Sequence, residues 1–139
     1  TRWVVGSNAN LPVLPESLDL VLCLFGFPVY SEFARVLKPG GQVIQVDAGA
    51  DHLRELREVI YPEVKPPGDF ESAAPEGFRQ LDSTVVRFPL TLPDQASIAD
   101  LLAMTPHLYR ASAEGLERAA ALESLEVTVD ATLKRFEKL

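Results

Sequence analysis

Residues 18–25 are apolar at every position except Asp19. A strand with apolar side chains on both faces is typical of a parallel sheet that is covered on both sides. Apolar residues at helical spacing follow and stop at Pro39-Gly40-Gly41, and an apolar strand comes next at residues 42–47. This order of strand, helix and strand predicts a parallel α/β sheet.

The rest of the chain continues the alternation of strands and helices. Ser31, Asp51 and Ser112 are residues of the kind that cap helix N-termini. Side chains alternate between apolar and polar at residues 125–134, so one face of that strand is buried and the other, with Asp130, is solvated. Such a strand lies near a sheet edge or runs antiparallel. In order, we expect a strand at 3–6, a strand at 18–25, a helix at 31–38, a strand at 42–47, a helix at 51–60, an irregular stretch at 62–79, a strand at 83–90, helices at 94–104 and 112–124, and a strand at 125–134. This is the second half of a doubly wound α/β sheet, in a single domain of residues 1–139.

The charge balance and the cysteine count exclude several classes of site. The chain has 13 Lys and Arg against 20 Asp and Glu, a net charge of −7, and its basic residues form no block, so the chain alone is expected to bind nucleic acid weakly or not at all. Cys23 is the single cysteine and no histidine pair has metal-ligand spacing, so we expect no disulfide and no metal site.

The ends and the hydropathy of the chain predict a cytoplasmic fragment. The longest apolar run is too short to cross a bilayer, and no signal peptide opens the chain, so we expect no membrane partner and a cytoplasmic location. Thr1 lies at the start of a predicted strand with no initiator methionine before it, which indicates a piece of a longer, truncated protein.

Four segments carry a resemblance to a known family. Asn10–Pro12 with Glu16–Val21, and Glu32–Gly41, resemble class I S-adenosylmethionine-dependent methyltransferases. Asp51–Val64 and Met104–Ala111 resemble the large-subunit rRNA guanine-N1 methyltransferases. The resemblance covers nearly all of this chain but only the C-terminal part of a family member. It implies an incomplete Rossmann-like methyltransferase sheet, made of the C-terminal strands and their flanking helices, from a parent enzyme that methylates guanine N1 of 23S rRNA.

The departures from the family concern the cofactor. Family members carry an N-terminal zinc-binding cysteine cluster and a glycine-rich loop that holds the methionine part of S-adenosylmethionine, where glycines allow the backbone to approach closely. In this chain Gly6 is followed by Ser7 and Asn8, which make no such loop. We therefore expect S-adenosylmethionine in the parent enzyme, but no bound cofactor and no activity in this chain alone.

The resemblance also implies which residues face the cofactor. Gly6, Ser7 and Asn8 follow the first predicted strand, where the family places a loop against the adenine, and open α/β sheets bind ligands at the carboxyl ends of their strands. The other reading of these three residues is an ordinary turn. The same argument places the end of the second strand, Leu24, Phe25 and Gly26, beside the cofactor.

Methylation of guanine N1 also needs a base and contacts to the substrate. Asp47 and Asp51 flank the next strand end and are the nearest carboxylates that could take a proton, although Asp51 also suits a helix cap and Asp47 a turn. Side chains that could contact or stack on a base are aromatic residues, histidines and arginines. The candidates for substrate binding are Phe27, Pro28, His52, Tyr61, His107 and Arg110. Phe27-Pro28-Val29 replaces a Pro-Cys-Lys-like turn of many family members.

Two other functions stay open at this point. The parent enzyme could act on a small molecule, since class I enzymes in general share much of this pattern. The chain could also be a non-catalytic remnant that forms a homodimer, because a bare apolar strand at Trp3–Gly6 would pair readily with another copy.

Overall fold

A computed structural model describes residues 3–64 and 73–139. Contacts between backbone positions divide the chain into two compact units. Unit 1 comprises Thr1–Asp47, Phe70–Val85 and Thr132–Leu139, and unit 2 comprises Ala48–Asp69 and Val86–Ala131. Each unit is described by itself below, and a single domain over residues 1–139 stays a prediction.

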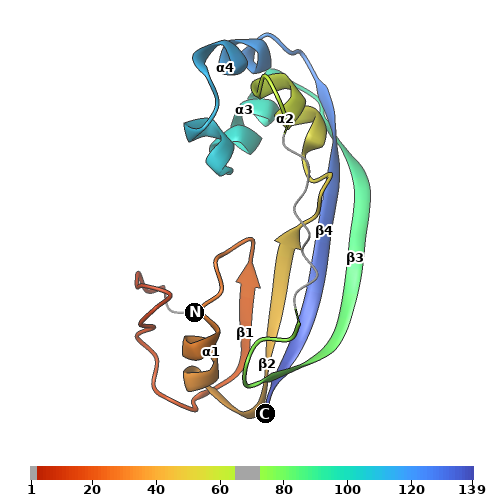
Figure 1. The fold of residues 1–139 in the computed structure, drawn as a ribbon. Coiled ribbons are helices and arrows are strands. Elements are labelled where there is room, and N and C mark those ends of the chain that lie inside the picture. The colour runs from red at the N-terminus through yellow and green to blue at the C-terminus, as the bar shows by residue number, and fades with distance from the viewer. Residues whose placement is uncertain (1–2, 65–72) are drawn as a thin grey trace. The chain divides into compact units, whose positions relative to one another are not determined.

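Helices and strands alternate in the order that the sequence predicts from residue 18 onward (Figure 1). A short 3-10 helix, labelled η1, follows the third α-helix and was not predicted from the sequence. The elements are β1 (Leu18–Leu24), α1 (Tyr30–Val36), β2 (Leu37–Ala48), α2 (Arg54–Ile60), β3 (Phe78–Leu92), α3 (Gln95–Ala103), η1 (Pro106–Tyr109), α4 (Ala113–Ala120) and β4 (Leu125–Lys138). Of the irregular stretch predicted at 62–79, residues 65–72 lie outside the described residues, 62–64 and 73–77 form no helix or strand, and β3 has begun by Phe78.

The four strands form one sheet in the order β1-β2-β4-β3. β1 and β2 are parallel, with Val21 beside Val43 and Cys23 beside Gln45, which confirms the predicted strand–helix–strand unit. The end of β4 lies beside the start of β3, since the backbone N–H of Leu139 donates to the carbonyl of Gly77 at 3.0 Å. β4 is therefore antiparallel to β3, as its alternating sequence allows, but it lies between two strands and not at an edge.

The predicted first strand at residues 3–6 does not form. Trp3, Val4 and Val5 belong to no helix or strand and are 91%, 70% and 103% exposed. A strand of this length needs a hydrogen-bonded neighbour, and no described strand lies against it. The prediction of a sheet edge at these residues is therefore wrong, and the edge on this side of the sheet is β1.

β1 is covered on one face only, where the sequence predicts cover on both. Cys23 is 8% exposed and packs in the core of unit 1, whereas Leu20, Leu22 and Leu24 are 45%, 58% and 57% exposed. Their side chains alternate along the strand, so the three leucines share the uncovered face. The core on the other face consists of Cys23, Phe33, Leu37, Val43, Phe78 and Phe136.

Only one of the three predicted helix caps is present. The hydroxyl oxygen of Ser112 accepts a hydrogen bond from the backbone N–H of Gly115 at 3.1 Å, as an N-cap should. α1 begins at Tyr30 with Val29 before it, so Ser31 lies inside the first turn. α2 begins three residues after Asp51, with Leu53 at the N-cap position, so the cap role of Asp51 is wrong.

The prediction that Asp130 faces solvent is also wrong. Asp130 is 6% exposed in unit 2, and its carboxylate accepts a hydrogen bond from the backbone N–H of Asp51 at 3.0 Å. Gly49 leaves the room for it, because a Cβ on Gly49 would lie 2.3 Å from a carboxylate oxygen of Asp130. A buried carboxylate is tolerated where hydrogen-bond donors meet it.

The core of unit 2 lies between α2, α3, α4 and the strands. It contains Leu53, Leu56, Ile60, Leu92, Ile98, Leu102, Ala119 and Val127. Across the described residues, no helix combines the length and the apolar character that crossing a membrane requires.

Candidate functional site

A chain of polar side chains lies toward the carboxyl ends of β1 and β2 in unit 1. The hydroxyl of Tyr30, the first residue of α1, donates a hydrogen bond to the amide oxygen of Gln45 on β2. The amide nitrogen of Gln45 donates in turn to a carboxylate oxygen of Asp47 at 2.7 Å. Because residues two apart on a strand share one face, β2 presents Gln45 and Asp47 to the same side. The arrangement holds the Asp47 carboxylate in one orientation.

The ring of Tyr30 is fixed by aromatic neighbours. Its centroid lies 6.1 Å from that of Phe33, 6.0 Å from Phe78 and 6.1 Å from Phe136. Edge-on and tilted contacts of this kind stabilise an aromatic cluster beyond the area that they bury. The Tyr30 hydroxyl thus extends from a packed core to the polar chain.

Burial and the charge of Asp47 both act on this site. Burial is the larger cause that raises the pKa of the Tyr30 hydroxyl, and the nearby Asp47 carboxylate raises it further. The same two causes, in the same order, raise the pKa of the Cys23 thiol. Both groups therefore stay protonated at neutral pH.

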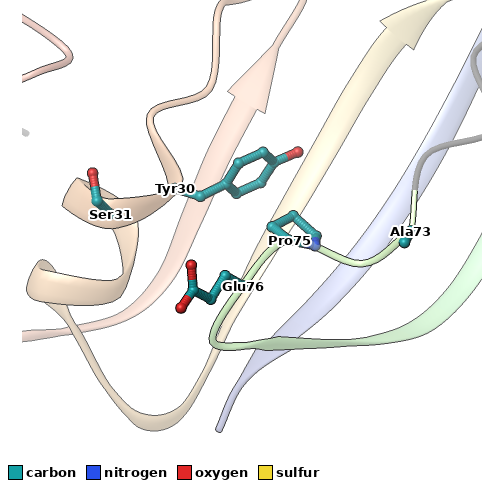
Figure 2. Close-up of a pocket in the computed structure, with 5 residues that line it drawn as sticks. All are labelled: Tyr30, Ser31, Ala73, Pro75 and Glu76. Carbon is teal, nitrogen blue, oxygen red and sulfur yellow. The ribbon is translucent and has the colours of Figure 1, made fainter.

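A hollow adjoins the other side of Tyr30 in unit 1. It has a volume of about 560 Å³ and is lined by Tyr30, Ser31, Ala73, Pro75 and Glu76. Figure 2 shows the Tyr30 hydroxyl directed away from the Glu76 carboxylate. Its size falls within the range of small-molecule sites, about 300–1,000 Å³.

One residue predicted to contact the cofactor, Asn8, lies against the turn after β1 in unit 1. The side-chain amide of Asn8 donates to the carbonyl of Phe27 at 3.1 Å, so the loop after residue 5 lies against the turn that follows β1. The hydroxyl of Ser7 accepts from the backbone N–H of Ala9 at 3.2 Å, which is a local turn contact. The structure thus brings together two segments that were predicted separately from the sequence.

The turn after β1 is anchored to β2 and exposes its apolar side chains. Phe25 has a positive φ of 50° and is 58% exposed, and its backbone N–H donates to the carbonyl of Val46 at 2.8 Å. Phe27 is 86% exposed, and Leu24 also faces solvent. Gly26 leaves ordinary contact space, since an added Cβ would lie 3.4 Å from the Cys23 sulfur. Pro28 is half-buried beside this turn.

Asp51 lies in unit 2 and is held by two arginines. Its carboxylate oxygens lie 3.1 Å from a guanidinium nitrogen of Arg54 and 2.8 Å from one of Arg87. The hydrogen bond from Arg87, followed by that from Arg54, lowers the pKa of Asp51. A carboxylate paired in this way is a weak base.

Two predicted substrate residues pair directly in unit 2. The Tyr61 hydroxyl lies 2.8 Å from Nδ1 of His107, and the two rings meet edge to face with centroids 5.6 Å apart. Arg110 follows η1 and is exposed. His52 also lies in unit 2, where its Nδ1 accepts a hydrogen bond from the backbone N–H of Asp130 at 3.2 Å.

No group of three or more His, Cys, Asp or Glu side chains in the described part of the chain could hold a metal ion.

Tyr30 and Gln45 are the site residues that the sequence did not single out. The available signal was Gln45 itself, a polar residue between the apolar residues Ile44 and Val46 of β2.

Lowering the pH from about 7.5 to about 5.5 is expected to destabilise unit 2. Burial is the main cause that lowers the pKa values of both His52 and His107. For His52, the hydrogen bond to Asp130 and the charge of Asp130 act in the opposite direction, and Arg57 adds a smaller lowering. For His107, Arg57 and Arg110 lower the pKa further. Between these pH values the unfolded chain binds more protons than the folded chain, so the free energy of unfolding decreases as the pH falls through about 6.5. Hydrogen exchange of the α2 amides measures the effect.

The double variant His52→Gln with His107→Gln is the control, since these are the only two histidines in the chain. Its stability should depend less on pH over this range. An unchanged pH dependence in the double variant would contradict the assignment.

Comparison with known proteins shows what this chain is similar to. No protein-family model matches the chain. A Bacillus subtilis (strain 168) protein with the name "Putative 23S rRNA (guanine-N(1)-)-methyltransferase YxjB" is 33% identical over 132 residues, which cover 92% of this chain and 46% of the relative. The resemblance to part of a class I S-adenosylmethionine-dependent methyltransferase is confirmed. The chain spans about half the length of this relative.

Solved structures agree on the fold. A structure from echinomycin biosynthesis, concerned with conversion of a disulfide bond into a thioacetal group, matches with a TM-score of 0.55 and 14% identity over 97% of this chain and 55% of the other. A Bacillus halodurans crystal structure named "putative methyltransferase" has a TM-score of 0.47 and 15% identity, covering 96% of this chain and 69% of the other. The predicted α/β fold is confirmed.

Proposed function

We propose that this chain is the C-terminal part of an S-adenosylmethionine-dependent methyltransferase that acts, as a whole protein, on guanine N1 of 23S rRNA in the cytoplasm. The observation that carries the proposal is the 33% identity over 132 residues to the relative that bears this name. The polar chain that ends at Asp47, at the carboxyl ends of parallel strands, supports it, because ligands of open α/β sheets bind there.

The residues of unit 1 suit one side of the methyl donor. Exposed Leu24 and Phe25 offer apolar surface for an adenine ring, and Asn8, held against Phe27, brings the preceding loop beside them. When bound, S-adenosylmethionine supplies the methyl group from its positively charged sulfur. After the transfer this sulfur is a neutral thioether. Gly6 and Ser7 belong to the same loop, and they would contact the adenine.

Asp47 has the role of general base in this proposal. The nitrogen N1 of guanine carries a proton that must leave when the nitrogen gains a methyl group, and the Asp47 carboxylate accepts it. Gln45 and Tyr30 act as positioning residues, because their hydrogen bonds keep the carboxylate in one orientation. Phe27 and Pro28 would contact the guanine from the turn after β1.

The chain alone is proposed to be inactive. The glycine-rich loop of the family has no counterpart in this sequence, and the exposed leucines on β1 are suited to being covered by the rest of the parent protein. The pocket for the methyl donor would then need both parts.

A chimera tests the proposed function. In it, this chain replaces the matching residues of the Bacillus subtilis relative, and the purified protein is incubated with 23S rRNA and S-adenosylmethionine labelled in the methyl group. We expect label in the rRNA and a stop in primer extension at one guanine, since a methyl group on N1 blocks base pairing. A folded chimera that transfers no label to rRNA would contradict the proposal, and label in a small-molecule extract instead would favour a small-molecule methyltransferase.

The uncovered edge of β1 favours one other function, a non-catalytic dimer. β1 is the edge strand, and Leu20, Leu22 and Leu24 are exposed on it. Such an edge pairs readily with a second copy. Sedimentation at micromolar concentration should then show a dimer, and the variant Leu22→Lys should be a monomer. A wild-type chain that sediments as a monomer would exclude this function.

A further inference from the structure

Most described cationic side chains have a carboxylate partner, and those without one are unevenly placed. The arginines and lysines at positions 35, 38, 54, 79, 87, 135 and 138 form ion pairs. Arg57, Arg110, Arg118 and Lys134 form none with any other described residue. In a chain with a net charge of −7, cations that lack a carboxylate need another explanation.

Arg57 and Arg110 share a surface of unit 2 with Tyr61 and His107. Tyr61 directly follows α2, and its backbone N–H donates to the carbonyl of Arg57 at 2.9 Å, so the two residues lie one helical turn apart. Arg110 directly follows η1, and its backbone N–H donates to the carbonyl of His107 at 3.1 Å. The contact of 2.8 Å between the Tyr61 hydroxyl and His107 joins the two pairs. We call these four residues the Tyr61–His107 surface.

The charges on this surface have one sign. Arg57, Arg110 and His52 are the titratable groups that act on His107, and all three disfavour its protonation. Arg57 donates to the carbonyl of Ala50 at 2.6 Å, while its Nε is buried and has no hydrogen-bond partner among the described residues.

We propose that the Tyr61–His107 surface binds phosphate groups of an RNA strand, an inference that rests on the proposed rRNA substrate. A guanidinium matches phosphate geometry and keeps its charge at any physiological pH. Arg110 is exposed and available for such a contact, and its neighbour Tyr109 is 86% exposed and can stack on a base beside the phosphate.

RNA binding by the full chain and two charge variants tests the proposal. The probe is a fluorescein-labelled single-stranded RNA of about 20 nucleotides, followed by anisotropy at several salt concentrations from about 50 mM upward. The variants are Arg57→Gln and Arg110→Gln. The matched control is Arg118→Gln, which removes the same charge from unit 2 at a residue that lacks an ion pair and does not act on His107.

We expect weak binding by the wild-type chain, with a dissociation constant on the order of 10–100 µM at low salt. Each of the two arginine variants should bind roughly three- to tenfold more weakly, with a salt slope smaller by about 1, while Arg118→Gln binds as the wild type does. Equal losses in all three variants, or no binding by the wild type at about 100 µM, would overturn the proposal.

The outcome is separable from that of the proposed function. A chimera that methylates rRNA while both arginine variants bind RNA normally would contradict the phosphate-binding surface and leave the proposed function in place. A chimera that fails to methylate, while the two variants still lose RNA binding, would leave a phosphate-binding surface in a protein of another function.

Discussion

Gly115→Ala is expected to lower the free energy of unfolding of unit 2 by about 2 kcal/mol or more, although alanine is the better helix former. A Cβ at Gly115 on α4 would lie 2.1 Å from the carbonyl oxygen of Ile60 and 2.8 Å from its carbonyl carbon. Both atoms are backbone at the end of α2, so they cannot move aside as a flexible side chain could. The two helices would have to separate.

The separation would open the core of unit 2. Ile60 and Leu56 on α2 are fully buried, and Ala119 on α4 is 1% exposed. Close packing means that a shift of one helix loosens many contacts at once. Helix propensity alone would stabilise the alanine variant by about 1 kcal/mol, so a net loss isolates the steric effect.

Hydrogen exchange at the amides of α2 and α4 measures this loss, with Glu117→Ala as the control. Glu117 is an exposed residue of the same helix, and its replacement should change stability by no more than about 0.5 kcal/mol. A Gly115→Ala variant as stable as the wild type would show that α4 and α2 do not approach closely.

Asp47→Asn is expected to reduce methyl transfer by the active chimera about 10²- to 10⁴-fold, which is the usual contribution of a general base. Asparagine has nearly the same shape and can still accept the hydrogen bond that Gln45 donates to Asp47 at 2.7 Å. It cannot take a proton from guanine N1. The dissociation constant for S-adenosylmethionine should therefore stay the same while the rate of transfer decreases.

Asp51→Asn is the matched control for this prediction. Asp51 is occupied by Arg54 and Arg87, so its replacement should lower stability and leave the rate of transfer within a fewfold of the wild type. Equal rates for Asp47→Asn and the wild type would remove Asp47 from the mechanism. A large loss in Asp51→Asn with normal folding would transfer the role of base to that residue.

The sequence predicts the elements whose signals are local. Runs of apolar residues, apolar residues at helical spacing, and alternating apolar and polar residues predict every strand and helix from β1 to β4 in the correct order. Ser112 caps α4, as its residue type predicts. The strand at residues 3–6 fails because a strand also needs a hydrogen-bonded partner, and no described strand pairs with these residues. The sequence of β1 also does not show that one of its faces is exposed, because the residues that cover a strand lie in other segments.

Long-range contacts decide the parts of the site that the sequence does not show. Gln45 and Asp47 are two residues apart on a strand, so their shared face is predictable. The hydroxyl of Tyr30 reaches Gln45 because the Tyr30 ring packs in an aromatic cluster with Phe78 of β3 and Phe136 of β4. Likewise, Asp130 looks solvated in its alternating strand, yet Gly49 and the backbone of Asp51 make a buried place for it.

Calorimetric titration of S-adenosylmethionine into the chain alone and into the chimera tests the central claim most directly. If the pocket for the methyl donor requires residues that this chain does not supply, the chain alone shows no heat of binding, whereas the chimera binds with a micromolar dissociation constant. Low-micromolar binding by the chain alone, or a folded chimera that does not bind, would contradict the account.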